Sequence, residues 1–221
     1  MCLRTRVRPF LVLNIMMAIR IKGRATFLHI TKNAGTSVTT CVRGSGNFQH
    51  TVQQHDTWHD LPEAWRDRVF AIVRNPWDRC LSMYNFLVMK SRDRAAWKST
   101  TMRRVNREQL ALLDRGFTHF VDRLQQQPFR KDEGRRAYLW PEDTQHRFLP
   151  EDPSLVRLLR FERLAEDWRD LVRDWDLALA PLEWHNRSRE QRGYREHYDR
   201  HARDVVAGLF REDVVRFGYR F

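Results

Sequence analysis

Two short segments carry residue types that can bind a phosphate group. The first reads LHITKNAGTS and runs from a β-type stretch through a turn into a helical pattern. Such a loop offers backbone N–H groups, a helix N-terminus and hydroxyls to an anion. It is not a Walker A loop, in which Lys follows the second Gly. An ordinary turn with an exposed Lys stays open as the other interpretation. The residues expected to bind are Lys32, Asn33, Ala34, Gly35, Thr36 and Ser37.

The second segment reads VRNPWDRCLSMY and combines a guanidinium with a hydroxyl. Arg74 follows a continuously apolar run, and Ser82 lies about two turns into the next helix. Because open α/β sheets bind ligands at the carboxyl ends of their strands, Arg74 is expected at a binding edge. A phosphate held by Arg74 and Ser82 would receive charge-assisted hydrogen bonds of ~1.5–3 kcal/mol each. Taken singly, Arg74 could equally form a salt bridge at the end of the strand. Ser82 could equally be a polar residue that the helix tolerates without a function.

The elements around these segments alternate between strand and helix. The strands are expected at 25–30, 69–73 and 155–159, with helices after the first two and over 161–175 and 201–210. Asn75 suits an N-cap and Pro76 the first helical position. This alternation predicts an α/β fold, a P-loop-like three-layer arrangement with a central parallel sheet flanked by helices.

Composition sets the size and the broad class. A chain of 221 residues with 42% hydrophobic content is enough for one well-packed domain. The net charge of +12 favours an anionic ligand or partner, although the many arginines that a GC-rich genome encodes would give the same excess. Cys2, Cys41 and Cys80 form no close pair, so neither a zinc knuckle nor a disulfide framework is indicated.

The N-terminal segment is treated as an extension, residues 1–20, with a single domain over 21–221. Its apolar run, 10–19, has about half the ~20 residues that a membrane-spanning helix needs. A signal-peptide core and a start at Met16 or Met17 remain alternatives. We expect no stable membrane span and a cytoplasmic location, with peripheral membrane association left open.

Together the two segments resemble the sulfotransferases that use 3′-phosphoadenosine 5′-phosphosulfate (PAPS), in the branch of carbohydrate and heparan sulfate 2-O-sulfotransferases and their bacterial relatives. The first is similar to that family's 5′-phosphosulfate loop, with Thr31 where Pro is usual and Asn33 where Thr or Ser is usual. The second is similar to its 3′-phosphate site. The likeness covers roughly 25–221 and includes QHRFL at 145–149 and LRFERL at 159–164.

The resemblance implies transfer of a sulfuryl group from PAPS to a hydroxyl, with 3′-phosphoadenosine 5′-phosphate (PAP) as product. The acceptor would be a carbohydrate, which the basic charge allows to be anionic. Lys32 would neutralise the leaving group and Arg74 and Ser82 would hold the 3′-phosphate. His55 would be the catalytic base, with His50 and His59 as rivals, and the C-terminal loop would approach the nucleotide through Asn186, Ser188 and Arg192.

Other functions remain open. His55/His59 and His197/His201 have the i,i+4 spacing of a metal pair, but no third ligand type accompanies them, and we expect no metal. A P-loop-like nucleotide-binding protein without sulfotransferase activity would use the same loop. A nucleic-acid-binding module is supported only by the charge; no nucleic acid is expected.

Overall fold

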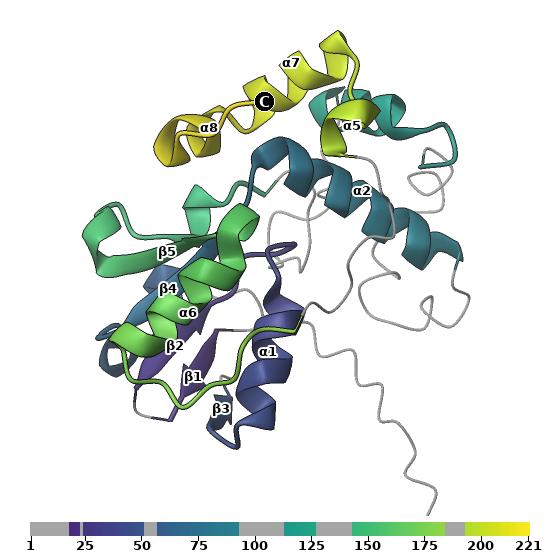
Figure 1. The fold of residues 1–221 in the computed structure, drawn as a ribbon. Helices are drawn as coiled ribbons and strands as arrows, with labels where there is room; N and C mark the ends of the chain where they lie inside the picture. The colour runs from purple at the N-terminus through teal and green to yellow at the C-terminus, as the bar shows by residue number, and fades with distance from the viewer. Residues whose placement is uncertain (1–17, 23, 51–56, 93–112, 127–142, 184–192) are drawn as a thin grey trace, which may run out of the picture.

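The computed structural model describes residues 18–22, 24–50, 57–92, 113–126, 143–183 and 193–221. Within them one five-stranded sheet has the order β3-β1-β2-β4-β5 (Figure 1). The strands are β1 (Ile19–Ile21), β2 (Ala25–Leu28), β3 (Phe48–His50), β4 (Val69–Val73) and β5 (Val156–Arg160). Strands β2, β4 and β5 are parallel, whereas β1 is antiparallel to both its neighbours. The predicted α/β class is confirmed, with an antiparallel edge added by the short β1–β2 connection.

Strand β4 lies at the centre of the parallel part and is buried on both faces. All five of its side chains are buried, as its uninterrupted apolar run predicts. Val69, Ala71 and Val73 belong to one hydrophobic core, while Phe70 and Ile72 belong to the other. The alternation follows from the two-residue period of a strand and makes β4 the wall that both cores share.

Helices cover both faces of the sheet, which confirms the three-layer arrangement (Figure 1). One core contains side chains of α1 (Gly35–Gly44) and α6 (Leu164–Asp174). The other core contains side chains from four helices, namely α2 (Pro76–Arg92), α5 (Phe117–Gln126), α7 (Arg200–Leu209) and α8 (Arg211–Phe217). Gly218 ends helix α8 with φ of 64°, a conformation that glycine adopts easily.

The sheet starts two residues before the expected boundary at residue 21. Ile19 and Ile21 are buried in the same core as Phe27, on one face of β1. Between them Arg20 is also buried and donates hydrogen bonds to Thr26 Oγ1 (3.0 Å) and Asp67 Oδ1 (2.7 Å). A basic residue inside a three-residue strand hides its apolar pattern, which explains why the sequence places Ile19 and Arg20 in the extension.

Candidate functional site

The loop between β2 and α1 lies at the carboxyl edge of the sheet and has an unusual backbone. Lys32 and Ala34 have φ of 67° and 58°, in the left-handed region that residues other than glycine rarely adopt. Such strain is concentrated at ligand sites in proteins. Ala34 is the N-cap of α1 and supplies no side-chain cap, so the first turn presents N–H groups and a positive helix end. The loop therefore has the features of an anion cradle.

Gly35, the first residue of α1, allows the loop to close on a buried histidine. A Cβ atom built at Gly35 would lie 1.9 Å from Nε2 of His29, far inside contact distance. His29 itself is buried and its ring centroid is 5.7 Å from that of Phe27 in β2. The missing side chain at Gly35 therefore lets the start of α1 approach the end of β2.

The two residues that depart from the family pattern are both committed to buried hydrogen bonds. Thr31 accepts two from Arg79, one at its carbonyl and one at its hydroxyl, each 3.0 Å long. Asn33 Nδ2 donates to Ile72 O and to Gln145 Oε1, both at 2.7 Å. Burial lowers the pKa of the Arg79 guanidinium, against the opposite effect of the Asp213 and Asp143 carboxylates. Both replacements therefore tie the loop to its surroundings.

Arg74 brings the two segments together. Its Nε and Nη2 donate to the Asp78 carboxylate at 2.8 and 2.9 Å, and its Nη1 donates to Lys32 O at 3.1 Å. The guanidinium also lies 4.0 Å from the ring centroid of Phe161. Of its five N–H donors, two have no partner among the described residues. A fixed guanidinium with spare donors beside the loop suits a phosphate.

Ser82 lies on the face of α2 that contacts the loop. Asp78, Ser82 and Phe86 follow one another at intervals of four, so they share one side of the helix. Asp78 pairs with Arg74, and Phe86 packs under the Lys32 ammonium, whose Nζ is 4.3 Å from the ring centroid. Ser82, half-buried between these two contacts, is therefore on the same side of α2 as Lys32 and Arg74.

Two of the three candidate bases, His50 and His59, are among the residues that the structure describes. His59 lies in the 3-10 turn Trp58–Asp60, is exposed, and accepts a hydrogen bond from Arg66 at its backbone carbonyl. His50 is the last residue of β3. His55, Asn186, Ser188 and Arg192 lie outside the described residues.

Polar residues outside the two binding segments, together with the predicted cap Asn75, complete the site. Gln145, fully buried, hydrogen-bonds to the backbone of Arg74, and Asp213, also fully buried, holds the backbone of Gln145. Asn75 acts as the predicted N-cap of α2, since its Oδ1 accepts from Trp77 N, and its own N–H donates to Glu162 Oε1. In the sequence, Gln145 and Glu162 are marked only by their positions in the family-like segments QHRFL and LRFERL.

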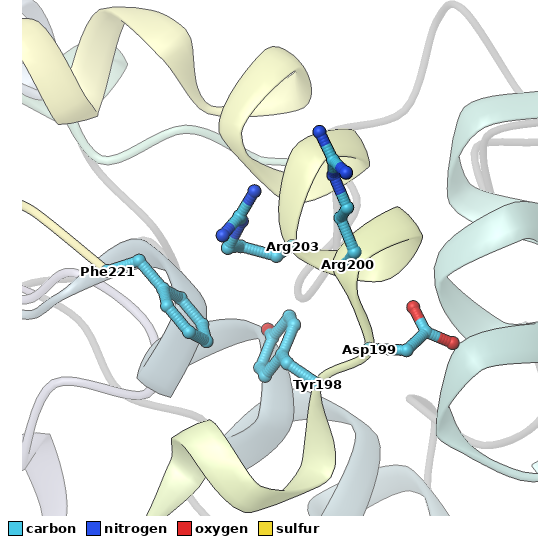
Figure 2. Close-up of a pocket in the computed structure, with 5 residues that line it drawn as sticks. All are labelled: Tyr198, Asp199, Arg200, Arg203 and Phe221. Atoms are coloured by element: carbon cyan, nitrogen blue, oxygen red, sulfur yellow. The ribbon is translucent and has the colours of Figure 1, made fainter.

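An open hollow of about 460 Å³ lies at the start of α7 (Figure 2). It is lined by Tyr198, Asp199, Arg200, Arg203 and Phe221. The Tyr198 hydroxyl donates to Trp77 O at 2.8 Å, and Trp77 Nε1 donates to Arg203 O at 2.9 Å. The walls of the hollow thus hold the first turn of α2, directly after Arg74.

One of the i,i+4 histidines pairs with a carboxylate at the surface. His201 Nε2 lies 2.7 Å from Asp122 Oδ1, a single pair at the surface. Across the described ranges, no three His, Cys, Asp or Glu side chains come together as a metal site. Nor does any helix in these ranges have the length and apolar character to cross a membrane.

Comparison with known proteins identifies the family of the chain. Neither the curated proteins nor the solved structures contain a match to the chain. A family model described as the sulfotransferase family matches residues 11–220, a span that includes the loop, Arg74, Ser82 and every described helix and strand. The chain therefore belongs to the sulfotransferase family.

Proposed function

We propose that this protein transfers a sulfuryl group from PAPS to a hydroxyl of a carbohydrate acceptor. One observation carries the proposal: Arg74 Nη1 donates to the carbonyl of Lys32, so the segments expected to hold the two ends of the donor share one edge of the sheet. The match to the family supports sulfuryl transfer. The resemblance of both segments favours the branch of carbohydrate and heparan sulfate 2-O-sulfotransferases and their bacterial relatives. We propose that this protein is a bacterial-type member and is cytoplasmic.

In the proposed reaction the acceptor oxygen attacks sulfur in line with the leaving phosphate oxygen. The new O–S bond forms as the S–O bond to the 5′-phosphate breaks, and PAP leaves with the bonding electrons. Negative charge grows on that phosphate, where the Lys32 ammonium and the N–H groups of the α1 start would stabilise it. The acceptor proton would pass to His55, a step that contributes ~10²–10⁴-fold in rate.

Arg74 and Ser82 are proposed to select the donor by its 3′-phosphate. Arg74 keeps two N–H donors without a partner among the described residues and pairs with Asp78. Ser82 lies one turn after Asp78 on the same face of α2. In the C-terminal loop, Asn186, Ser188 and Arg192 would close on the nucleotide. The mechanism needs no metal, because the charge on the leaving group is met by Lys32 and helix dipole.

Calorimetric titration with PAP, with 5′-AMP as the comparison, tests the donor. We expect PAP to bind more tightly than AMP by at least ~10-fold, because the 3′-phosphate adds one or more charge-assisted hydrogen bonds. Arg74→Ala should remove the difference. The matched control is Arg157→Ala, which removes an arginine of β5 that pairs with Asp174 instead.

Equal binding of PAP and AMP, or binding of neither, would refute the donor assignment. In that event a salt-dependent affinity for nucleic acid becomes the function to measure. If PAP binds as expected, transfer from radiolabelled PAPS to neutral and acidic polysaccharides tests the acceptor. His55→Ala should then reduce turnover ~10²-fold or more with little effect on PAP affinity.

A further inference from the structure

Strand β4 loses one of its two neighbours, β2, before the carboxyl edge, while β5 stays paired to Val73, and side chains replace β2 there. The last paired residues of β2 and β4 are Leu28 and Ala71, after which β2 turns into the loop. Beyond that point Ile72 O accepts from Asn33 Nδ2. The backbone of Arg74 is then paired twice with one side chain: its N–H donates to Gln145 Oε1 at 2.9 Å, and its carbonyl accepts from Gln145 Nε2 at 2.8 Å.

The Gln145 amide thus accepts from the N–H of Arg74 and donates to its carbonyl, as the backbone of a neighbouring strand would. Its Oε1 also accepts from Asn33 Nδ2 at 2.7 Å, so a single oxygen contacts both the loop and the end of β4. Gln145 and Asn33 are completely buried. Breaking a buried hydrogen bond of this kind costs free energy, because the polar groups that lose their partner have no water to bond with.

Gln145 is itself held from the opposite side by α8. The Asp213 carboxylate accepts from the backbone N–H groups of Gln145 (2.7 Å) and His146 (2.9 Å). It also contacts His146 Nδ1 at 2.9 Å, and it is completely buried. Asp213 therefore sets where the Gln145 side chain can reach, and a chain of contacts runs from α8 to both binding segments.

We infer that Gln145 is a positioning residue for the donor site: its amide fixes the backbone of Arg74 relative to the loop, so that the Arg74 guanidinium and Lys32 meet one ligand. The residue acts through Arg74 and Asn33 and need not touch the donor itself. This inference rests on the proposed function for the identity of the ligand, but the contacts can be tested without it.

Gln145→Met, which keeps the side-chain length and removes the hydrogen bonds, is the test variant. We expect its affinity for PAP to fall roughly 10- to 100-fold, as small displacements of a binding group do. In an Arg74→Ala background, Gln145→Met should reduce PAP affinity much less, because the Arg74 guanidinium that Gln145 positions is absent. Leu171→Ala removes a buried side chain of α6 and controls for lost stability. It should leave PAP affinity unchanged while the protein is folded.

Amide hydrogen exchange gives a readout that does not need the nucleotide. In Gln145→Met the N–H of Arg74 should exchange faster, while the N–H of Leu159 in β5 keeps its protection. Parent-like PAP affinity in Gln145→Met, equal losses with and without Arg74, or unchanged exchange at Arg74 would each overturn the inference. If the parent binds no PAP, the donor assignment fails, and exchange at Arg74 alone then decides for or against Gln145.

Discussion

At the scale of single residues, the loop between β2 and α1 takes its shape from residues that adopt backbone conformations which most residues avoid. Lys32 and Ala34 adopt positive φ, and Gly35 leaves room for the His29 ring. The compensating contacts are the buried hydrogen bonds of Thr31 and Asn33, which hold the strained segment from both sides. A pre-formed loop loses less conformational entropy when an anion binds.

Gly35→Ala should damage this loop. The added methyl would force α1 away from His29, which we expect to cost about 1–3 kcal/mol of folding free energy and to weaken PAP binding. Gly44→Ala at the other end of α1 is the matched control, since a Cβ there meets nothing within 4 Å. The control should be neutral or stabilising by about 0.5–1 kcal/mol. Thermal unfolding and calorimetry measure both effects, and equal behaviour of the two variants would contradict the argument.

Ser82→Ala should discriminate between nucleotides. With the hydroxyl gone from the α2 face that contacts the loop, PAP affinity should fall ~10-fold while AMP affinity stays the same, because AMP lacks the 3′-phosphate. Ser91→Ala, on the same helix, removes a hydroxyl that bonds to Val88 O and should change neither affinity. Parallel calorimetric titrations decide; a loss shared by PAP and AMP would remove Ser82 from the 3′-phosphate site.

At the scale of elements, the one charged residue of strand β1 adds an ion pair to the backbone pairing that holds the strand between β3 and β2. Arg20 is buried and pairs with Asp67, whose side chain is half exposed, and the hydrogen bond from Arg20 lowers the pKa of that carboxyl. A carboxyl with a lowered pKa in the folded state contributes stability above its unfolded pKa and loses it as the pH falls through the folded value. The contribution is therefore present at neutral pH and declines in acid.

Asp67→Asn should lower the free energy of unfolding by about 1 kcal/mol at neutral pH, a value reduced for the solvent exposure of the pair. The difference between parent and variant should begin to shrink as the pH falls below about 4, where the Asp67 carboxyl of the unfolded chain takes up a proton, and should be lost once the pH has passed below the lowered pKa of the folded state. Urea unfolding at several pH values measures it. A difference that does not vary with pH would mean that the ion pair contributes nothing to the stability of β1.

At the scale of the whole molecule, β4 joins two cores that would otherwise be separate. Each face of the sheet has its own cluster of buried side chains, and successive residues of β4 enter them in turn. Removing packing on either face therefore disturbs the strand on which the other face depends. We expect both cores to unfold in one cooperative transition.

Leu171→Ala in α6 and Phe120→Ala in α5 test this coupling. Each should lower stability by about 2–5 kcal/mol, since a large buried side chain is lost. Circular dichroism and tryptophan fluorescence should still report the same midpoint in each variant. Two separate midpoints in either variant would show that the faces unfold independently.

What the sequence determines by itself is local. The strand Val69–Val73, the cap at Asn75, the start of α2 at Pro76 and the loop before α1 all follow from short-range signals: an apolar run, a proline, a glycine and a change of period. These signals suffice because the backbone conformation of each segment depends mostly on its own residues. They also place Lys32 and Arg74 at strand ends, where a parallel sheet brings them to the same edge.

Only the tertiary structure decides which distant groups complete that edge. Gln145 is 71 residues from Arg74 and 68 residues from Asp213, and no periodicity connects them. The antiparallel strand β1, between β3 and β2, is likewise settled by packing, since three residues with a central arginine carry too little pattern. The physical reason is the same in both cases: a buried polar group must find a partner, and the partner is chosen by the folded chain, whatever its position in the sequence.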